Sequence, residues 1–496
     1  MTGDIRVLLP LLFLMGGAFS VYVLARFLSV RFRAQRNQIL ALFSTIVFGA
    51  ALVAFLFLQP GTRVDVYPRW GRLEPGGAFL QADPGAVVMA ILVCGLGGVV
   101  ALYSGRYLAL DRRYETYYPL LLLLASGLVG MLMAADLFNL YMFCELTNIA
   151  AYVLVAFRRR TRTAIEAGFK YLMMGSTGTA VMLLGISWIY RETGGLLFFQ
   201  LAGAPGPYAR AGIACLLVGL GLKSAIVPLH TWLPDAHGRA PSSISAMLSG
   251  VVIQVAFYVL LKVCLGLGLP AVRLGGVLML LAIINMSVGN LLALRQIHTK
   301  RLLGYSTIAQ MGTIMLAIGI GLYYGQPAAI QAGVFMILVH AVMKGLAFLC
   351  KGACNFYRGA TLVEDLRGMF ADMPQIAVMF GIALAGLAGV PPLAGFAGKW
   401  LVLQEALRVL DVWGYIALAL FLINSLIALG YYLPLIAIMF SVSDRKYKDR
   451  ERVPVSPWMV WPVGALAVLV FVMGVYPVFW LRWVAEVGPY ILMLGR

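Results

Sequence analysis

The sequence has few charged residues. Asp, Glu, Lys and Arg make up 12% of its 496 residues, against about 25% in an ordinary soluble domain. Hydrophobic residues make up 62%, which excludes a soluble enzyme. The sequence also lacks a phosphate-binding loop before a helix, a glycine-rich dinucleotide fingerprint after a strand and a Ser/His/Asp set. We therefore expect no cofactor and no active site of the chain's own.

Cysteine and histidine are also scarce. Five of the six cysteines lie inside apolar runs, where a thiol packs as a small hydrophobic group: Cys94, Cys144, Cys215, Cys264 and Cys350. No disulfide framework is implied. Cys350 and Cys354 have three residues between them, with no second cysteine pair and no clustered histidines, so a metal site is not expected.

Long apolar runs are what the sequence has in abundance. About 20 apolar residues cross a bilayer as a helix, and the first run shows no signal-peptide cleavage pattern. We predict an all-α polytopic membrane protein in which residues 1–496 form a single membrane domain. About 14 crossings are expected, at residues 5–25, 39–58, 86–103, 118–135, 137–157, 168–190, 211–229, 243–268, 270–294, 302–324, 328–350, 375–398, 412–440 and 458–484.

The basic residues indicate the orientation. Most of the 38 Lys and Arg residues follow odd-numbered runs, and fewer lie on the opposite side, which includes both termini. Because Lys and Arg collect on the cytoplasmic side, we predict a cell-membrane protein with both termini outward. Orientation and contact with anionic headgroups of the lipid bilayer explain the net charge of +18, so no nucleic-acid partner is expected.

The remaining basic residues lie inside apolar runs or at their rims, and all are lysines: Lys170, Lys223, Lys262, Lys344 and Lys399. An isolated charge at the bilayer centre costs at least about 2.5–3.5 kcal/mol, so such residues commonly mark an ion path. Lysine can lose its proton when desolvated, whereas arginine cannot. This pattern favours proton transfer.

Two of these lysines lie beside prolines that interrupt apolar runs. Lys223 precedes Pro228, and Lys399 follows Pro391 and Pro392 about 175 residues later. Interrupted helices at matching places indicate an internal repeat, and transporters place ion sites at such breaks. The alternative is a pair of proline kinks with snorkelling lysines.

Three further groups complete the candidate path. Glu145 lies within the fifth run, where a buried acid needs a cationic partner. We place it on the candidate path, and the alternative is a static ion pair that holds two helices together. His340 and Lys344 are four residues apart, so they share a helix face. Gln254 and Lys262 stand about 12 Å apart along one helix, and Lys262 is as consistent with snorkelling as with function.

Four stretches resemble one known family: residues 136–145, 221–237, 300–312 and 391–399. They are similar to the proton-conducting, antiporter-like membrane subunits. These include the large membrane subunits of respiratory complex I, the A-type and D-type proteins of Mrp cation/proton antiporters, and counterparts in membrane-bound hydrogenases. The resemblance covers nearly the whole chain, and the Trp-Leu-Pro-Asp segment within 221–237 is highly specific.

The resemblance implies two inverted five-helix repeats, 118–268 and 270–440, with flanking helices in 1–117 and 441–496. It places Glu145, Lys223, Gln254, His340, Lys344 and Lys399 on the proton path, with Lys170, His230, His237 and Lys262 as accessory candidates. The family usually has Lys or His where this chain has Gln254. Because glutamine cannot carry a proton, a water chain or His340 would have to bridge that position.

The resemblance also implies a function. The length of the chain favours a D-type protein of an Mrp Na⁺/H⁺ antiporter. The alternative is a proton-pumping subunit of a redox-driven complex. Partners would be other membrane subunits, with protons and, for an antiporter, sodium as cargo. In the expected mechanism Glu145 stabilises protonated Lys223, and weakening this pair sends the proton towards Lys399. A structural subunit with a decayed channel is a third possibility, supported only by Gln254.

Overall fold

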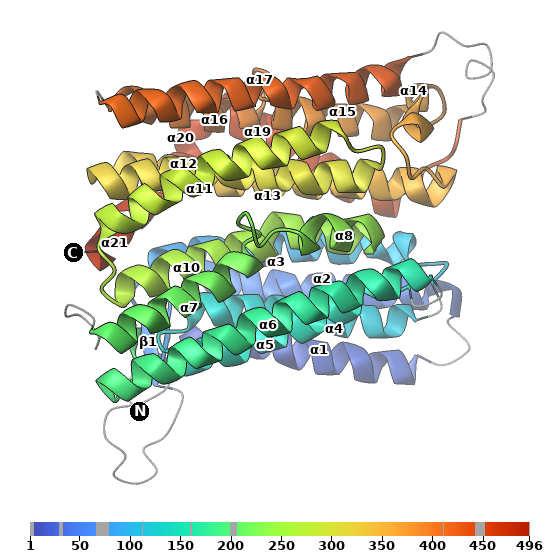
Figure 1. Ribbon diagram of the computed structural model, residues 1–496. Helices are drawn as coiled ribbons and strands as arrows, with labels where there is room; N and C mark the ends of the chain where they lie inside the picture. The colour runs from blue at the N-terminus through green and yellow to red at the C-terminus, as the bar shows by residue number, and fades with distance from the viewer. Residues whose placement is uncertain are drawn as a thin grey trace.

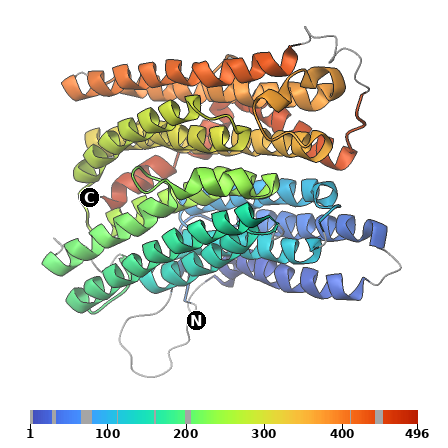
Figure 2. The same cartoon turned by 45° about the vertical axis from the view of Figure 1, so that its right-hand side comes forward.

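The fold is a bundle of long helices that run side by side (Figures 1 and 2). This computed structural model describes residues 4–28, 33–65, 79–111, 113–158, 161–198, 206–409, 411–441 and 452–495. Predicted positions outside these ranges, such as the basic residues in 442–451, lie outside the described residues.

The long helices follow the order of the apolar runs. They are α1 (Leu9–Phe27, after the turn η1, Ile5–Leu8), α2 (Arg33–Leu56), α3 (Pro84–Tyr107), α4 (Tyr114–Met133), α5 (Leu137–Val155), α6 (Arg162–Thr193), α7 (Pro207–Lys223) with α8 (Trp232–Arg239), the run of α9 (Ser242–Met247), η4 (Leu248–Val252) and α10 (Ile253–Gly266), α11 (Ala271–Leu294), α12 (Thr299–Tyr324), α13 (Pro327–Arg358), α15 (Pro374–Ala388) with α16 (Ala394–Leu407), α17 (Val412–Phe440) and α19 (Pro457–Val475).

The remaining elements are short. They are the turn η5 (Glu364–Leu366), α14 (Met369–Asp372), α20 (Pro477–Trp483), α21 (Val487–Leu494), and two antiparallel strands, β1 (Arg63–Asp65) and β2 (Phe79–Gln81). The strands and α21 are absent from the sequence prediction. Each is too short to give a periodic apolar signal.

The described ranges contain twelve uninterrupted helices that are long and apolar enough to cross a membrane. The two predicted runs missing from this set are 211–229 and 375–398. Prolines interrupt both of these runs, and the structure divides them into α7 with α8 and α15 with α16. The all-α polytopic fold and the two broken helices are therefore confirmed.

The breaks have similar local features. The first follows Lys223 and contains a cis Val227–Pro228 bond, and the second contains a cis Pro391–Pro392 bond. At the second break the helix α15 ends at Gly389, whose φ of +92° is a left-handed conformation that glycine adopts without strain. The amide of Gly389 donates to the carbonyls of Ala385 and Gly386, which closes the helix end.

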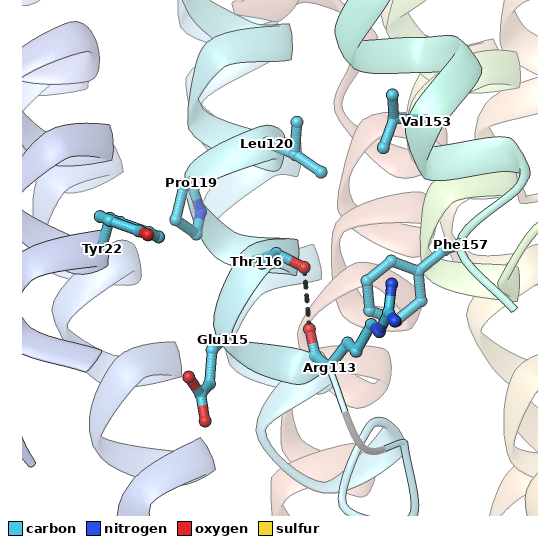
Figure 3. A pocket seen from close by; sticks show the side chains of 8 residues that line it. All are labelled: Tyr22, Arg113, Glu115, Thr116, Pro119, Leu120, Val153 and Phe157. Carbon is cyan, nitrogen blue, oxygen red and sulfur yellow. Dashed lines mark hydrogen bonds between the residues drawn. The ribbon is translucent and has the colours of Figure 1, made fainter. Parts of the chain in front are cut away.

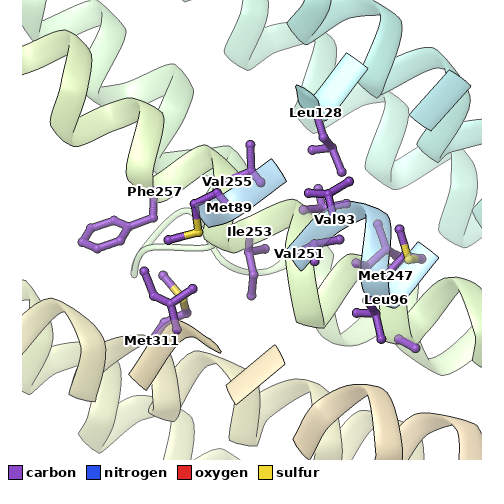
Figure 4. Close-up of a cluster of buried hydrophobic side chains, with 14 of the residues drawn as sticks. Met89, Val93, Leu96, Leu128, Met247, Val251, Ile253, Val255, Phe257 and Met311 are labelled. Carbon is purple, nitrogen blue, oxygen red and sulfur yellow. The ribbon is translucent and has the colours of Figure 1, made fainter. Parts of the chain in front are cut away.

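The centre of the bundle is built from α10, α12 and α13. The most apolar window of α13 and that of the α9–α10 run are fully buried, whereas less than half of the corresponding window is buried in α6 and in α17. Figure 4 shows apolar side chains of this core, with Met89 of α3 close to Ile253 and Val255 of α10. The outer helices therefore present the lipid-facing surface, and the interior helices carry the candidate site.

Both marked chain ends lie on the left-hand side of Figure 1. The opposite end carries the C-termini of α5, α8, α11 and α13 and the N-termini of α6 and α12. The odd-numbered apolar runs, which most of the basic residues follow in the sequence, all end on this side, so we call it the basic end. Its assignment to the cytoplasm stays a prediction from the charge pattern.

Candidate functional site

The first break places Lys223 at the last residue of a half-helix inside the bundle. A cation there is favoured by the partial negative charge of the helix C-terminus. The backbone groups exposed by the break find partners on other elements. The amide of Val227 donates to Asn285 Oδ1 of α11 (2.9 Å), and Trp232 Nε1 donates to the carbonyl of Leu222 (2.9 Å). The break is thus supported by protein groups, as irregular backbone within a membrane must be.

Lys223 is 4% exposed, and in the described part of the chain its ammonium donates to neutral groups of α5. Lys223 Nζ donates to Asn148 Oδ1 (2.7 Å), to the carbonyl of Cys144 (3.1 Å) and to Cys144 Sγ (3.2 Å). These contacts use its three donors. Sequence reasoning missed Asn148, because an amide one turn beyond Glu145 gives no signal of its own.

Glu145 lies on the same helix but does not pair with Lys223 in this structure. Across the described residues, no ion pair within 4 Å includes Glu145, and its Oε1 atom is buried without a hydrogen-bond partner. The carboxylate is adjacent in sequence to Cys144, whose carbonyl accepts from Lys223. The expected direct pair between Glu145 and Lys223 is therefore absent here. The ammonium of Lys223 donates to neutral groups of α5 instead.

A central cluster lies between α8, α12 and α13. Lys344 is fully buried and donates to the carbonyl of Leu303 (2.8 Å) and to Ser306 Oγ. His340, one turn earlier on α13, is fully buried with no hydrogen-bond partner for either ring nitrogen within the described part. His340 and Lys344 thus share a helix face, as their spacing predicts.

His237 brings α8 to this cluster. Its ring stacks on Phe348, with centroids 4.8 Å apart, and Phe348 lies one turn beyond Lys344 on α13. A Cβ at Gly304 of α12 would lie 3.3 Å from His237 Cδ2, so the imidazole also packs against α12. Both ring nitrogens are buried without a partner among the described atoms. The structure therefore places the imidazole of the first broken helix against α13, at the residue one turn beyond Lys344. The other accessory histidine, His230, is 9% exposed in the break itself.

A polar stripe on α12 leads from Lys344 towards the second break. Ser306, Gln310 and Thr313 are spaced four and three residues apart, so they lie on one helix face. Gln310 is 4% exposed, its Nε2 donates to the carbonyl of Leu387 at the end of α15 (3.1 Å), and its Oε1 is buried without a partner in the described residues. The sequence places this glutamine in a family-like stretch but gives it no role.

The stripe ends at a small cavity beside Lys399. The cavity measures ≈ 10 Å³ and is lined by Met286, Asn290, Ala309, Gln310, Thr313, Lys399, Asn424, Ser425 and Ala428. Lys399 is partly buried and donates to the carbonyl of Ala388 (3.0 Å). Asn290 donates to Asn424 Oδ1 (3.1 Å) and accepts from the hydroxyl of Tyr431 (2.9 Å). A polar cavity of this size holds about one water molecule.

Gln254 lies in the apolar core. It is fully buried, and neither side-chain polar atom has a partner in the described part of the chain. Its neighbours Ile253 and Val255 belong to the cluster of Figure 4. A π-helical segment, η4, directly precedes α10, and such segments are frequent at functional sites.

Lys262 does not snorkel. It is 2% exposed and forms an ion pair with Asp83, whose side chain is fully buried (Nζ to Oδ2, 2.8 Å). Lys262 also donates to the carbonyl of Leu132 (2.9 Å), while Asp83 accepts from the amide of Ala86 (2.8 Å) at the start of α3 and from the Tyr258 hydroxyl. This carboxylate was not expected, because it lies in a short segment far from Lys262 in sequence.

Lys170 belongs to the surface of the basic end. Its side chain is 50% exposed and pairs with Glu166 (2.8 Å) and Asp235 (3.5 Å). It therefore lies apart from the buried groups, because α6 begins earlier than predicted and places Lys170 near its N-terminus.

The bundle also contains a cavity of ≈ 560 Å³ that none of the buried lysines lines (Figure 3). It lies at the basic end, where Tyr22 of α1 faces α4 and Val153 of α5 closes the other side. Its lining residues in the described part are Tyr22, Arg113, Glu115, Thr116, Pro119, Leu120, Val153 and Phe157. It is separate from the polar groups described above.

The fold and its buried lysines define a polytopic membrane protein with two interrupted helices, each bearing a lysine at the break. Residues 134–428 match the family described as NADH:quinone oxidoreductase/Mrp antiporter, transmembrane, and the chain belongs to this family. Similar curated proteins include NADH-quinone oxidoreductase subunit N 1 of Solidesulfovibrio magneticus, 34% identical over 447 residues and covering 86% of this chain and 92% of the relative. NADH-quinone oxidoreductase subunit N of Ruthia magnifica is 28% identical over 496 residues, 97% of each chain.

Solved structures agree. A chain of the membrane-bound sulfane sulfur reductase, an archaeal respiratory membrane complex, matches with a TM-score of 0.86 and 28% identity over 99% of this chain and 98% of that one. A chain of respiratory complex I from Thermus thermophilus matches with a TM-score of 0.73 and 27% identity, covering 95% and 98%. A chain of the Mrp complex from Dietzia sp. shares the fold, with a TM-score of 0.85 at 22% identity and full coverage of both chains. The resemblance inferred from the four stretches is confirmed.

Proposed function

We propose that this chain is a proton-translocating membrane subunit of a redox-driven respiratory complex of the NADH-quinone oxidoreductase type. The sequence alone favours a D-type Mrp antiporter protein, with the redox-driven pump as the alternative. The relatives named above belong to NADH-quinone oxidoreductase, which supports the alternative better. Its partners would be the other membrane subunits and the redox subunits of that complex, in a cell membrane.

The observation that carries the proposal is the bonding of three lysines. Lys223, Lys344 and Lys399 donate to carbonyls, an amide, a hydroxyl or a thiol. Within the described residues none of them has a carboxylate within 4 Å. A nearby carboxylate stabilises the charged form of a lysine far more strongly than a neutral acceptor does. None of these three lysines is held by such an ion pair in the described residues, which is the arrangement that we expect of a relay residue.

The proposed path runs along the polar groups of the interior. A proton passes from Lys223 by way of His237 to Lys344, and from Lys344 along Ser306 and Gln310 to Lys399. The two halves, 118–268 and 270–440, would each supply one part of the path. His237 offers a titratable group between the halves, so transport need not pass through Gln254.

Glu145 would act as the switch at the start. Movement of its carboxylate towards Lys223 would hold the proton, and withdrawal to the position in this structure would release it. The same helix carries Asn148 and Cys144, which accept from the ammonium when Glu145 does not. The driving change would come from the neighbouring subunits of the complex.

A pair of Lys→Arg variants tests the proposal. Arginine keeps the charge but cannot release its proton. In the intact complex reconstituted into vesicles, Lys223→Arg should lower proton uptake driven by NADH and quinone by at least about tenfold. Lys262→Arg is the matched control, since that lysine is equally buried but bound to Asp83, and it should pump near the normal rate.

Three outcomes would decide against the proposal. Normal pumping in an assembled Lys223→Arg complex would remove Lys223 from the path. Proton movement that needs a sodium gradient and no electron donor would favour the antiporter. A wild-type complex that reduces quinone without moving protons would favour the structural subunit.

A further inference from the structure

The basic end contains a cavity that the proton path does not use. It measures ≈ 260 Å³ and is formed by the N-terminal turns of α6 and α12, the C-terminal turns of α8 and α13, and residue 361. In Figures 1 and 2, α8 lies between α6 and the pair α11–α12. The cavity therefore lies at the seam between the two predicted repeats, at the level where a helix bundle meets lipid headgroups.

Its lining has an excess of positive charge. Five basic side chains face two carboxylates: Lys170, Arg239, Lys300, Arg301 and Lys351, against Glu166 and Asp235. His298 and three polar residues, Thr163, Asn355 and Thr361, also line it. The cations come from α6, α8, α12 and α13, so folding brings them together from distant parts of the sequence.

The two carboxylates are already engaged. Glu166 pairs with Lys170 (2.8 Å), and Asp235 lies 3.5 Å from Lys170 and 3.4 Å from Arg301. Just outside the lining, Asp365 accepts from the backbone amides of residues 361 and 362 (2.7 Å each), which hold the pKa of its carboxyl below the usual value. The acids near the cavity thus have other partners.

Three cations remain without a carboxylate within 4 Å in the described residues: Arg239, Lys300 and Lys351. Lys300 Nζ donates to the carbonyl of Ala240 (2.7 Å), and Lys351 Nζ donates to that of Ala360. Each ammonium has three donors, so each retains capacity for an anionic oxygen. Lys351 is 1% exposed, and a buried cation with unused donors is costly unless an anion approaches.

The flanks of the cavity are apolar and face outward. Beside Lys170, α6 exposes Ile165 (49%), Phe169 (59%) and Met173 (53%). On the other side, the end of α11 exposes Leu291 (54%) and Leu294 (45%), followed by Ile297 (67%). A ligand held by the cations would thus have hydrocarbon-facing surfaces on both sides.

We propose that this cavity binds the headgroup of an anionic phospholipid, whose acyl chains lie along the exposed faces of α6 and α11. Basic pockets between membrane helices on the cytoplasmic side are the common setting for such headgroups. The phosphate accepts from Arg239 and Lys300, and the lipid bridges the two repeats at their basic end. This inference does not depend on proton transport.

Photo-crosslinking tests the site in the intact complex. The complex is reconstituted into phosphatidylcholine vesicles that contain a small fraction of photoactivatable phosphatidylglycerol, and the labelled peptides are mapped by mass spectrometry. Peptides of α6 and α11 should be labelled by phosphatidylglycerol and far less by photoactivatable phosphatidylcholine. The double variant Arg239→Gln, Lys300→Gln should reduce this labelling on the order of tenfold, since each basic residue near a membrane surface contributes severalfold to the affinity.

The matched control removes the same charge elsewhere. Arg26 and Arg106 are exposed residues of the basic end that neither line the cavity nor lie on the faces of α6 and α11 beside it, so Arg26→Gln, Arg106→Gln should label like wild type. Arg239→Gln alone, at an exposed position, should give an intermediate loss and serves if the double variant fails to assemble.

Other results would overturn the proposal. Equal labelling by the two lipids, or an equal loss in the control variant, would show a general surface effect. Displacement of the lipid by millimolar inorganic phosphate would indicate a site for soluble anions. Cross-links from this cavity to an acidic segment of a neighbouring subunit, in place of lipid, would identify a protein interface.

Discussion

Substitution of Gln310 separates a transport role from a packing role. This side chain links the end of α15 to the cavity of Lys399 and has one buried oxygen without a partner in the described residues. Leucine nearly matches glutamine in volume and removes both polar atoms. Glutamate keeps the shape and can gain or lose a proton. The two variants therefore change the same position in opposite chemical directions.

The expected magnitudes differ for the two roles. Gln310→Leu removes the hydrogen bond to the carbonyl of Leu387 and leaves that carbonyl unsatisfied, at a cost of about 1–3 kcal/mol. If the side chain holds a water molecule of the proton path, pumping should fall by at least about tenfold, which corresponds to about 1.4 kcal/mol in the barrier. Gln310→Glu should stay within about threefold of wild type. If Gln310 only packs, Gln310→Glu should pump less than Gln310→Leu, because burying glutamate costs more than burying leucine.

The assay compares proton uptake with quinone reduction in vesicles that contain the complex. Quinone reduction measured with an ionophore shows whether each variant is assembled and active. Thr307→Val is the control, because Thr307 is the next buried hydroxyl after Ser306 on α12, but it faces Ser249 (2.7 Å). Normal pumping by the leucine variant, or poorer pumping by glutamate than by leucine, would refute the role of Gln310.

Three further variants probe other parts of the site. Asp83→Asn leaves Lys262 charged and buried without its partner, which should destabilise the protein by about 3–5 kcal/mol and lower its midpoint of thermal unfolding in detergent; an unchanged midpoint would contradict a structural pair. Gln254→Lys should retain or raise coupled transport in vesicles if that position lies on the path, whereas loss of assembly would indicate tight packing. His237→Phe keeps the stacking on Phe348 but removes the titratable ring, so pumping should fall by about tenfold while assembly, checked by gel filtration, is preserved; normal pumping would exclude His237.

Much of the fold follows from the sequence because the bilayer imposes a simple length rule. Apolar runs of about 20 residues mark the crossings, and the prolines at 228 and 391–392 mark the two breaks. Lys223 and Lys344 are interior as expected, and Lys262, for which snorkelling was an open alternative, is buried as well. The ends of the helices were less predictable. The helix α6 begins at Arg162, before the predicted run 168–190, because its first turns include charged residues.

The partners of the interior groups could not be predicted, because they depend on which helix faces turn towards each other. Asn148 and Asn285 have no sequence feature that distinguishes them from other polar residues of their helices. Their roles follow from their distances to Lys223 and to the break. Asp83 pairs with a lysine 179 positions away in the chain, a distance over which helix periodicity carries no information.

The type of acceptor at each ammonium divides the buried lysines into two groups. Lys262 is held by a fully buried carboxylate that also caps α3, so loss of its proton would leave that negative charge without a counterion. Lys223 and Lys344 are held by neutral oxygens, so deprotonation leaves only hydrogen-bonding groups that water or a neighbouring side chain can satisfy. The first arrangement fixes a charge and joins two helices. The second keeps a lysine in place in either protonation state, which a relay residue requires.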